Sequence, residues 1–151
     1  MRARSLHSPV GDLTLFAEAG ALVALEWGWV PDQTAGDPLL EDAVRQLHEY
    51  FDGRRRAFDL PLAPSGSAFE RRVWAALCEI DFGTMLSYRE LAEQVASVPR
   101  AIGRAVARNP LPILIPCHRV VGSDGALVGY SGGEGIETKR ALLVLEGALA
   151  C

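Results

Sequence analysis

The sequence lacks the apolar segments that mark membrane-spanning and secreted proteins. No stretch of its 151 residues approaches the roughly 18 uninterrupted apolar residues of a transmembrane helix. The first five residues, Met-Arg-Ala-Arg-Ser, do not lead into the apolar core of a secretory signal. We therefore expect a cytoplasmic protein that does not bind a membrane.

Cysteine is scarce, and its spacing matches neither a metal site nor a disulfide framework. Cys78, Cys117 and Cys151 form an odd, widely separated set without a C-x-x-C pair. His7 and His48 have no cysteine or histidine neighbour at ligand spacing. We expect free thiols in a reducing compartment, no metal ion and no cofactor.

Acidic residues are absent from one stretch, residues 96–122, although the chain carries a net charge of −4. Four arginines lie in that stretch, and Arg100, Arg104 and Arg108 follow one another at the four-residue spacing of a single helix face. A phosphate backbone responds to the local charge within a Debye length, so the acidic total does not exclude DNA. Because a merely solvated face usually mixes signs, the pattern favours DNA binding.

The first part of the chain predicts a small α/β lobe. Short apolar runs over residues 5–30 predict an antiparallel meander, and helical spacing of apolar residues from Leu39 predicts a helix that ends before Gly53. Phe58-Asp59-Leu60 is expected to add a strand. Pro64-Ser65-Gly66 is typical of a linker, so we expect one domain over residues 1–64 and a second over 67–151.

The second part predicts a helical domain. Two S-x-x-E capping boxes, at Ser67 and Ser87, predict helices over residues 67–80 and 87–96. A third helix is expected from Pro99 to Arg108, because proline suits the first turn of a helix. A hairpin turn at Ser123-Asp124-Gly125 and a last helix over residues 134–146 complete a helix-turn-helix with a wing.

Cys117 is the strongest candidate for a nucleophile. It follows Pro116 and precedes His118, which could deprotonate the thiol through one water. Such a base needs an orienting carboxylate, and Glu146 is an acid within an otherwise apolar segment. Cys78, in contrast, shares a helix face with apolar residues and is expected in the core.

Three segments are more specific together than any of them is alone. They are Asn109-Pro110-x-Pro112-x-x-x-Pro116-Cys117-His118-Arg119-Val120, then Gly129-Tyr130-Ser131-Gly132-Gly133, then Leu142-Leu143-x-x-Glu146-Gly147. With them the chain resembles the O6-alkylguanine-DNA alkyltransferases, the methylated-DNA–protein-cysteine methyltransferase family. The resemblance is close over residues 67–148. It implies an RNase H-like α/β (α+β) lobe followed by a winged-helix-like domain.

The resemblance implies a role for each matching residue. Cys117 would take the alkyl group from O6 of guanine once and irreversibly, while Glu146 holds His118 and Asn109 forms a hinge between the arginine helix and Cys117. Tyr88 would donate to the flipped base. The substrate pocket would also contain Val120, Val128, Tyr130 and Ser131. Arg100 would enter the base stack from the minor groove, and the further DNA contacts would come from Arg104, Arg108 and Arg119.

The implied partner is double-stranded DNA that carries O6-alkylguanine, with O4-alkylthymine as an open alternative, and the protein is expected to act as a monomer near the nucleoid of a prokaryote. Val128 stands where some relatives carry glycine, which predicts a narrower pocket. Three other functions fit parts of the sequence: a non-catalytic binder that flags alkylated DNA, a winged-helix transcription factor with a redox-sensing cysteine, and a cysteine hydrolase. The first would lack the cysteine, the second gives Tyr88, Asn109 and Glu146 no role, and the third needs a histidine that contacts the thiol directly.

Overall fold

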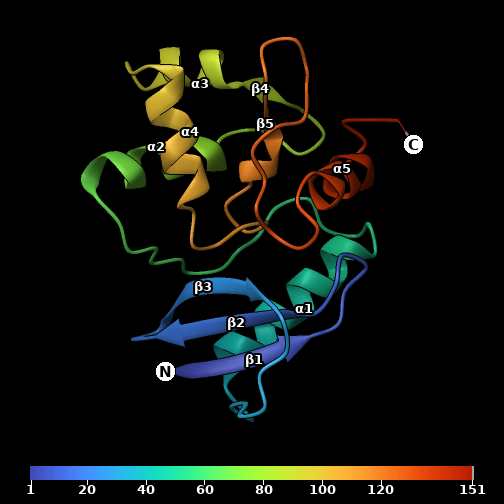
Figure 1. Cartoon of the computed structure of the whole chain (residues 1–151). Coiled ribbons are helices and arrows are strands. Elements are labelled where there is room, and N and C mark those ends of the chain that lie inside the picture. Colours follow the sequence, from blue (N-terminus) through green and yellow to red (C-terminus); the bar gives the residue numbers. More distant parts are fainter. Residues whose placement is uncertain (151) are drawn as a thin grey trace. The chain divides into compact units, whose positions relative to one another are not determined.

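The computed structural model describes residues 1–150 and divides into two compact units, of which the second begins at Gly66. The first unit is a three-stranded antiparallel sheet with one helix (Figure 1). Its strands β1 (Arg2–Leu6), β2 (Leu13–Glu18) and β3 (Ala21–Trp27) pair in sequence order, and helix α1 (Pro38–Phe51) packs on β1 and β2. The predicted meander and helix are confirmed.

The strand expected at Phe58-Asp59-Leu60 is wrong. In this segment the sheet gains only an isolated bridge between Leu22 and Leu62, where the Leu22 N–H donates to the Pro61 carbonyl. Pro61 has no N–H of its own to donate, which prevents a continuous ladder here. The chain therefore crosses the edge of the sheet without adding a strand.

Over residues 66–150 the second unit contains four helices and two short strands. They are α2 (Ala68–Cys78), β4 (Leu86–Ser87), α3 (Tyr88–Gln94), α4 (Pro99–Ala107), β5 (Val120–Val121) and α5 (Ile136–Leu145), with the 3₁₀ turn η1 (Cys117–Arg119) directly before β5. Both capping boxes are confirmed, because the serine hydroxyl and the glutamate carboxylate exchange hydrogen bonds with each other's backbone at Ser67/Glu70 and Ser87/Glu90. Helix α3 ends earlier than predicted, where Ala96 adopts a positive φ of 55°.

Helix α4 is held against α2 by packing and by one buried hydrogen bond. Its buried residues are Ile102, Ala105 and Val106, and the indole N–H of Trp74 donates to the Ala105 carbonyl at 2.8 Å. The opposite side of α4, which carries its arginines, is exposed. The packing thus determines which face of the arginine helix reaches solvent.

Two expectations about this unit are corrected. The turn at Ser123-Asp124-Gly125 exists, but no described residue after it forms the second strand of a hairpin; β5 instead pairs in parallel with β4. Cys78 is exposed rather than buried, because it is the last residue of α2 and lies beyond the buried Val73, Trp74 and Leu77. Within residues 1–150, no helix is long and apolar enough to cross a membrane.

Candidate active site

A constrained loop leads from α4 to Cys117. The Asn109 side chain spans it, donating from Nδ2 to the Ile115 carbonyl at 2.9 Å and accepting from the Leu111 N–H at 2.9 Å. Ile113, buried and β-branched, adopts φ 74°, a conformation rare for such a residue. Such strain persists only where the surroundings impose it, and it is common near functional sites. Asn109 therefore connects the start of this loop to the residue before Pro116.

Pro116 turns the chain tightly just before the thiol. Its φ of −78° and ψ of 66°, together with the 2.7 Å hydrogen bond from the Cys117 N–H to the Ile115 carbonyl, define an inverse γ-turn. Cys117 then begins η1 and is only 6% exposed. Pro116 and Asn109 thus restrict the position of the sulfur.

Burial raises the pKa of the Cys117 thiol, since a thiolate is poorly solvated there. Two neighbours act in the opposite direction: a hydrogen bond from the Asn109 side chain and the positive charge of Lys139 both lower that pKa. The site therefore keeps the thiol protonated at rest and has groups that favour the thiolate as it forms.

His118 and Glu146 form the hydrogen bond that the sequence predicted. The His118 Nε2 and the Glu146 Oε2 are 2.7 Å apart, and both side chains are fully buried. Burial lowers the pKa of His118 despite the opposing influence of the carboxylate, so the imidazole is neutral at neutral pH and able to accept a proton. Its other nitrogen, Nδ1, is buried and has no hydrogen-bond partner among the described residues.

Arg119 does not lie where a DNA contact requires it. Its guanidinium donates to both oxygens of Glu146, from Nε at 2.8 Å and from Nη2 at 3.0 Å, and from Nη1 to the Ile80 carbonyl at 2.6 Å. The residue is 7% exposed. The expectation that it binds DNA is therefore corrected: Arg119 neutralises the buried Glu146 and fixes it for His118.

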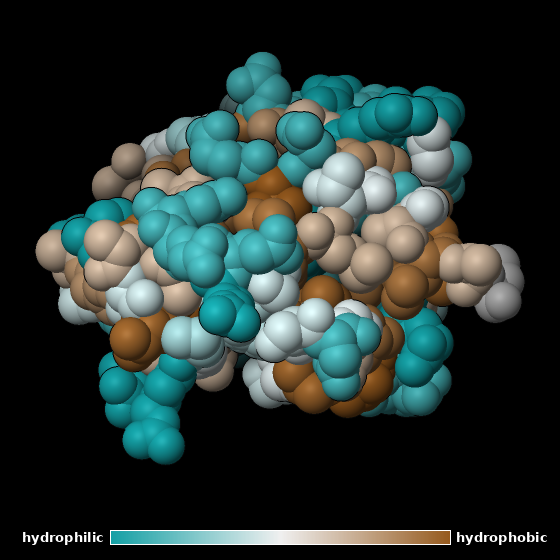
Figure 2. Space-filling model, turned by 90° about the horizontal axis from the view of Figure 1, so that it is seen from above, coloured by the Kyte–Doolittle hydropathy of each residue, from teal (hydrophilic) through white to brown (hydrophobic). Residues whose placement is uncertain are grey.

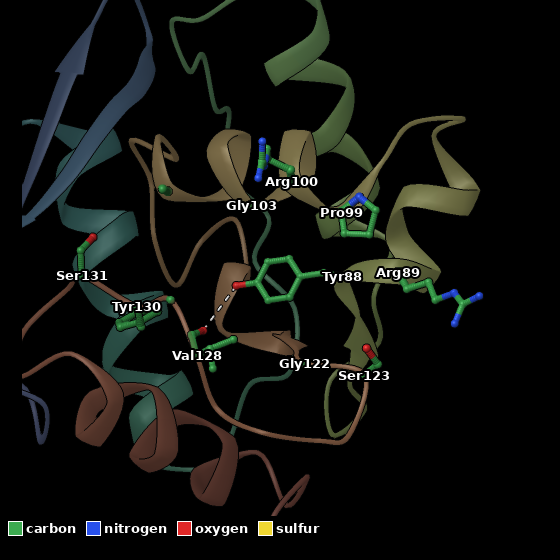
Figure 3. Close-up of a pocket in the computed structure, with 12 residues that line it drawn as sticks. Tyr88, Arg89, Pro99, Arg100, Gly103, Gly122, Ser123, Val128, Tyr130 and Ser131 are labelled. Atoms are coloured by element: carbon green, nitrogen blue, oxygen red, sulfur yellow. Dashed lines mark hydrogen bonds between the residues drawn. The ribbon is translucent and has the colours of Figure 1, made fainter.

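A pocket of about 720 Å³ opens in the second unit (Figure 3). Its wall includes four residues expected to bind the substrate: Tyr88, Val128, Tyr130 and Ser131. The Tyr88 hydroxyl donates to the Val128 carbonyl at 3.4 Å across the pocket. Burial raises the pKa values of both Tyr88 and Tyr130, and the charge of Cys117 raises them further, so both phenols lie near the sulfur. The pocket has the size of a small-molecule site.

The glycine-rich loop approaches the pocket closely at Gly129. Its φ is 70°, and a Cβ placed there would lie 3.0 Å from the Tyr88 hydroxyl. Glycine at this position therefore allows both the turn and the contact between the loop and Tyr88.

Lys139 is a residue of this site that sequence reasoning missed. It lies on α5 with no exposed surface, and its ammonium donates to the carbonyls of Val120 and Val128, each at 2.6 Å. The available signal was its uniqueness: the chain contains one lysine, and that lysine is followed two residues later by an apolar run. A charged residue on the apolar side of a helix is a reason to expect a buried partner.

The exposed face of α4 carries the expected arginines. Arg100 and Arg104 are exposed and form no ion pair with any described residue, whereas Arg108, just past the end of the helix, lies 3.6 Å from Glu70. Arg100 also lines the pocket, next to Gly103 and Pro99 (Figure 3).

On the face shown in Figure 2, hydrophobic surface lies in separate patches among hydrophilic side chains. Residues 1–150 contain no group of three potential metal ligands.

Comparisons with known proteins identify the family of the chain. Residues 68–148 match the family described as "6-O-methylguanine DNA methyltransferase, DNA binding domain", and residues 1–64 match its "ribonuclease-like domain". The chain is 39% identical to a methylated-DNA–protein-cysteine methyltransferase of Methanosarcina barkeri, over 93% of this chain and 94% of that protein. It is 42% identical to one of Mycobacterium tuberculosis, over 95% and 90%.

Solved structures give the same result. The crystal structure of the Mycobacterium tuberculosis O6-methylguanine methyltransferase superposes with a TM-score of 0.84 at 40% identity, covering 99% of this chain and 94% of that one. A structure of the Mycobacterium tuberculosis protein in complex with DNA gives a TM-score of 0.87 at 42% identity, with 98% and 94% covered. The chain therefore belongs to the 6-O-methylguanine DNA methyltransferase family, and it repairs DNA by transferring alkyl groups to a cysteine of its own.

Proposed function

We propose that Cys117 is the acceptor and that it removes the alkyl group from O6 of a guanine flipped out of duplex DNA. The observation that carries this assignment is the buried hydrogen bond between Glu146 and His118, 2.7 Å long, since His118 directly follows Cys117. The sulfur also lies near Tyr88 and Tyr130, which line the pocket. Cys78, exposed at the end of α2, has no comparable surroundings. Of the two cysteines that the structure describes, Cys117 is the one with a histidine next to it and with phenols of the pocket nearby.

The chemistry is a displacement at the alkyl carbon. The Cys117 proton passes to His118 through a water, the thiolate forms the new S–C bond, and the C–O6 bond breaks with its electron pair remaining on the base. Glu146 stabilises the imidazolium that results. The guanine anion takes a proton and becomes guanine. Because the thioether is stable, each molecule reacts once.

Recognition of the base falls to the residues around the pocket. The Tyr88 hydroxyl donates a hydrogen bond to the base and offsets the charge that develops on it as the C–O6 bond breaks. The Ser131 amide faces O6, and the carbonyls of Cys117 and Val120 accept from the exocyclic amine. Tyr130 lines the pocket beside them, and Val128 restricts the size of the alkyl group. Guanine bearing a small O6-alkyl group is thus the preferred lesion, and O4-alkylthymine is a poorer fit because it lacks that amine.

Base flipping follows from the burial of the sulfur. Cys117 is 6% exposed, and O6 is not reachable by such a group while the base is stacked in a duplex. Arg100, exposed at the start of α4 and also on the wall of the pocket, can occupy the space that the base leaves. Arg104 and Arg108 contact phosphates. All of these groups belong to the second unit of one chain, so a monomer suffices. It acts at the nucleoid of a prokaryote.

The test is an intact-mass measurement after incubation with duplex DNA that contains O6-methylguanine. We expect a gain of about 14 Da, one methyl group in place of one hydrogen, located on Cys117 by peptide mapping. The Cys117→Ser variant should bind the duplex and gain no mass, while Cys78→Ser, the matched control, should react like the parent. Methylation located on Cys78 would overturn the assignment.

A further inference from the structure

The start of helix α4 exposes an apolar side chain where helices usually carry a polar cap. Val98 is the N-cap residue, and its side chain makes no capping hydrogen bond. Serine, threonine, aspartate and asparagine are preferred at this position, and an apolar residue there lowers the stability of the helix. Ser97 stands directly before it, so the sequence holds a good capping residue one position too early. The chain therefore forgoes stability at this point and presents a valine.

Val98 is exposed and firmly held. Its exposed fraction is 60%, and Val128 is the one other large hydrophobic side chain that is exposed among the described residues of the second unit. Its backbone is extended, with φ −120° and ψ 152°, the conformation that a following proline, here Pro99, favours. The Val98 carbonyl accepts from the Ile102 N–H at 3.2 Å. Because a β-branched side chain on a fixed backbone has few rotamers, its direction is set as well.

Val98 also precedes the residues that would meet the lesion. Pro99 and Arg100 follow it directly, and both line the pocket (Figure 3). Arg100 is the residue proposed above to occupy the space that the flipped guanine leaves. Since one residue separates Val98 from Arg100, Val98 then meets a base pair beside that space. Proteins that bind the minor groove frequently place apolar side chains against the base step that they open.

The minor groove offers such a side chain one distinction between base pairs. An A·T pair presents only acceptors there, whereas a G·C pair adds the exocyclic amine of guanine, which is a donor. The isopropyl group of valine has no acceptor, so it covers that amine without replacing the water that the amine binds. A buried donor without a partner is costly. Val98 therefore fits an A·T pair beside the lesion better than a G·C pair.

We propose that Val98 is a specificity-determining residue, which makes repair depend on the base pair next to the lesion and favours A·T over G·C. This inference rests on the proposed role of Cys117 and on the entry of α4 from the minor groove. The flipped guanine is the same in every sequence context, so the pocket treats all contexts alike. The preference thus belongs to the start of α4 and not to the chemistry at the sulfur.

The first experiment measures single-turnover repair of O6-methylguanine in duplexes that differ only in a pair next to the lesion. Hypoxanthine in place of guanine removes the exocyclic amine, and 2,6-diaminopurine in place of adenine adds one. At one of the two neighbouring positions, the parent should repair duplexes without the amine at least about fivefold faster, because a buried donor without a partner costs that much or more. Equal rates in all four contexts, at both neighbouring positions, would overturn the proposal.

The Val98→Thr variant separates the effect of the side chain from that of the DNA. Pairs without the amine also open more easily, but this advantage belongs to the duplex and is shared by every variant. Threonine keeps the branched shape and adds a hydroxyl that accepts a hydrogen bond from the amine. The ratio of the rates without and with the amine should therefore fall at least about threefold from parent to variant, and this double cycle isolates the contact. An unchanged ratio would overturn the proposal.

The matched control is Val128→Thr, the same substitution at the other exposed valine. Val128 lines the pocket that all duplexes share, so this variant should change the rate by the same factor in every context. A loss of the preference in this variant too would overturn the assignment to Val98. Val98→Thr should unfold at a higher denaturant concentration than the parent, since threonine is a better N-cap than valine. A lost preference therefore cannot come from a weakened fold.

The salt dependence of DNA binding distinguishes the valine from the arginines that follow it. Val98 carries no charge, so Val98→Thr should leave the slope of log affinity against log salt at the parent value. A flatter slope would show that the substitution displaces phosphate contacts of α4, and this would overturn the proposal. If the parent fails to methylate Cys117 in any context, the proposed function is wrong. If the parent reacts and the neighbouring pair has no effect, only the assignment of Val98 is wrong.

Discussion

The buried groups around Cys117 and the exposed face of α4 use positive charge in opposite ways. In the buried cluster each cation has fixed partners: Arg119 binds Glu146, and Lys139 binds two carbonyls. On the face of α4, Arg100 and Arg104 form no ion pair with any described residue. Chemistry at one sulfur needs charges that do not move, whereas contact with a DNA backbone needs charges that remain free to adapt. Substitutions in the two regions should therefore fail in different assays.

Glu146→Gln should give the largest effect, because it removes the anion shared by two buried side chains. Breaking a buried ion pair costs about 3–5 kcal/mol of unfolding free energy, since an uncompensated charge remains. The variant should lose that stability in chemical denaturation. It should also react at least about a hundredfold more slowly with both duplex and free base, because His118 loses its orienting carboxylate.

The matched control is Glu137→Gln on the exposed side of α5, which should leave stability and rate unchanged. If Glu146→Gln unfolds below the assay temperature, Arg119→Met gives a second test, because it removes one partner of the carboxylate and keeps the other. A Glu146→Gln variant with parental stability would show that the buried pair contributes nothing to the fold.

Arg100→Ala should affect duplex DNA more than the free base. Its guanidinium is exposed and makes no contact with the buried cluster, although it lines the pocket, so the reaction with free O6-benzylguanine should change much less. Repair of an O6-methylguanine duplex should slow by about tenfold or more, because unstacking a base costs a few kcal/mol that the inserted arginine offsets. Single-turnover rates on the two substrates make the comparison. Equal losses on both would remove the plug assignment.

The two regions were also predictable to different degrees. The arginine face, both capping boxes and the pairing of His118 with Glu146 were predicted from residue spacing and from the family resemblance, and all are present in the structure. These features depend on local periodicity or on short motifs, which a sequence displays directly. The function of the chain was predicted for the same reason.

Two of the errors, those about Arg119 and the hairpin, concern contacts between distant segments. Arg119 looked like one more free arginine because Glu146 and Ile80, its partners, lie 27 and 39 residues away. The hairpin after Val121 looked plausible because turn and apolar residues were both present, but a lysine from α5 binds the carbonyls that a ladder would have used. Neither partner choice is visible in local sequence patterns.

His118 makes the stability of the buried cluster depend on pH. Burial lowers its pKa below the unfolded value of 6.5, so between these two pKa values the unfolded chain binds more protons than the folded one. Stability should therefore be fully present above pH 6.5 and fall as the pH decreases, by up to about 1.4 kcal/mol per pH unit. Denaturation of the parent and of His118→Gln at several pH values checks this. The difference between their free energies of unfolding should change as the pH falls below 6.5, and a constant difference would contradict the lowered pKa of His118.

The smallest effects should separate Arg104 from Arg108 on the exposed face. Arg104 forms no ion pair with any described residue, so Arg104→Ala should lower the slope of log affinity against log salt by about 1, the value for one phosphate contact. Arg108 lies 3.6 Å from Glu70, which already neutralises part of its charge, so Arg108→Ala should change the slope less.

Glu70→Gln keeps the capping box and frees Arg108. If exposed charge acts through phosphates alone, this variant should bind unmodified duplex slightly more tightly than the parent, with a steeper salt dependence and an unchanged rate on the free base. A flatter dependence would mean that Glu70 positions Arg108 for DNA rather than competing with it.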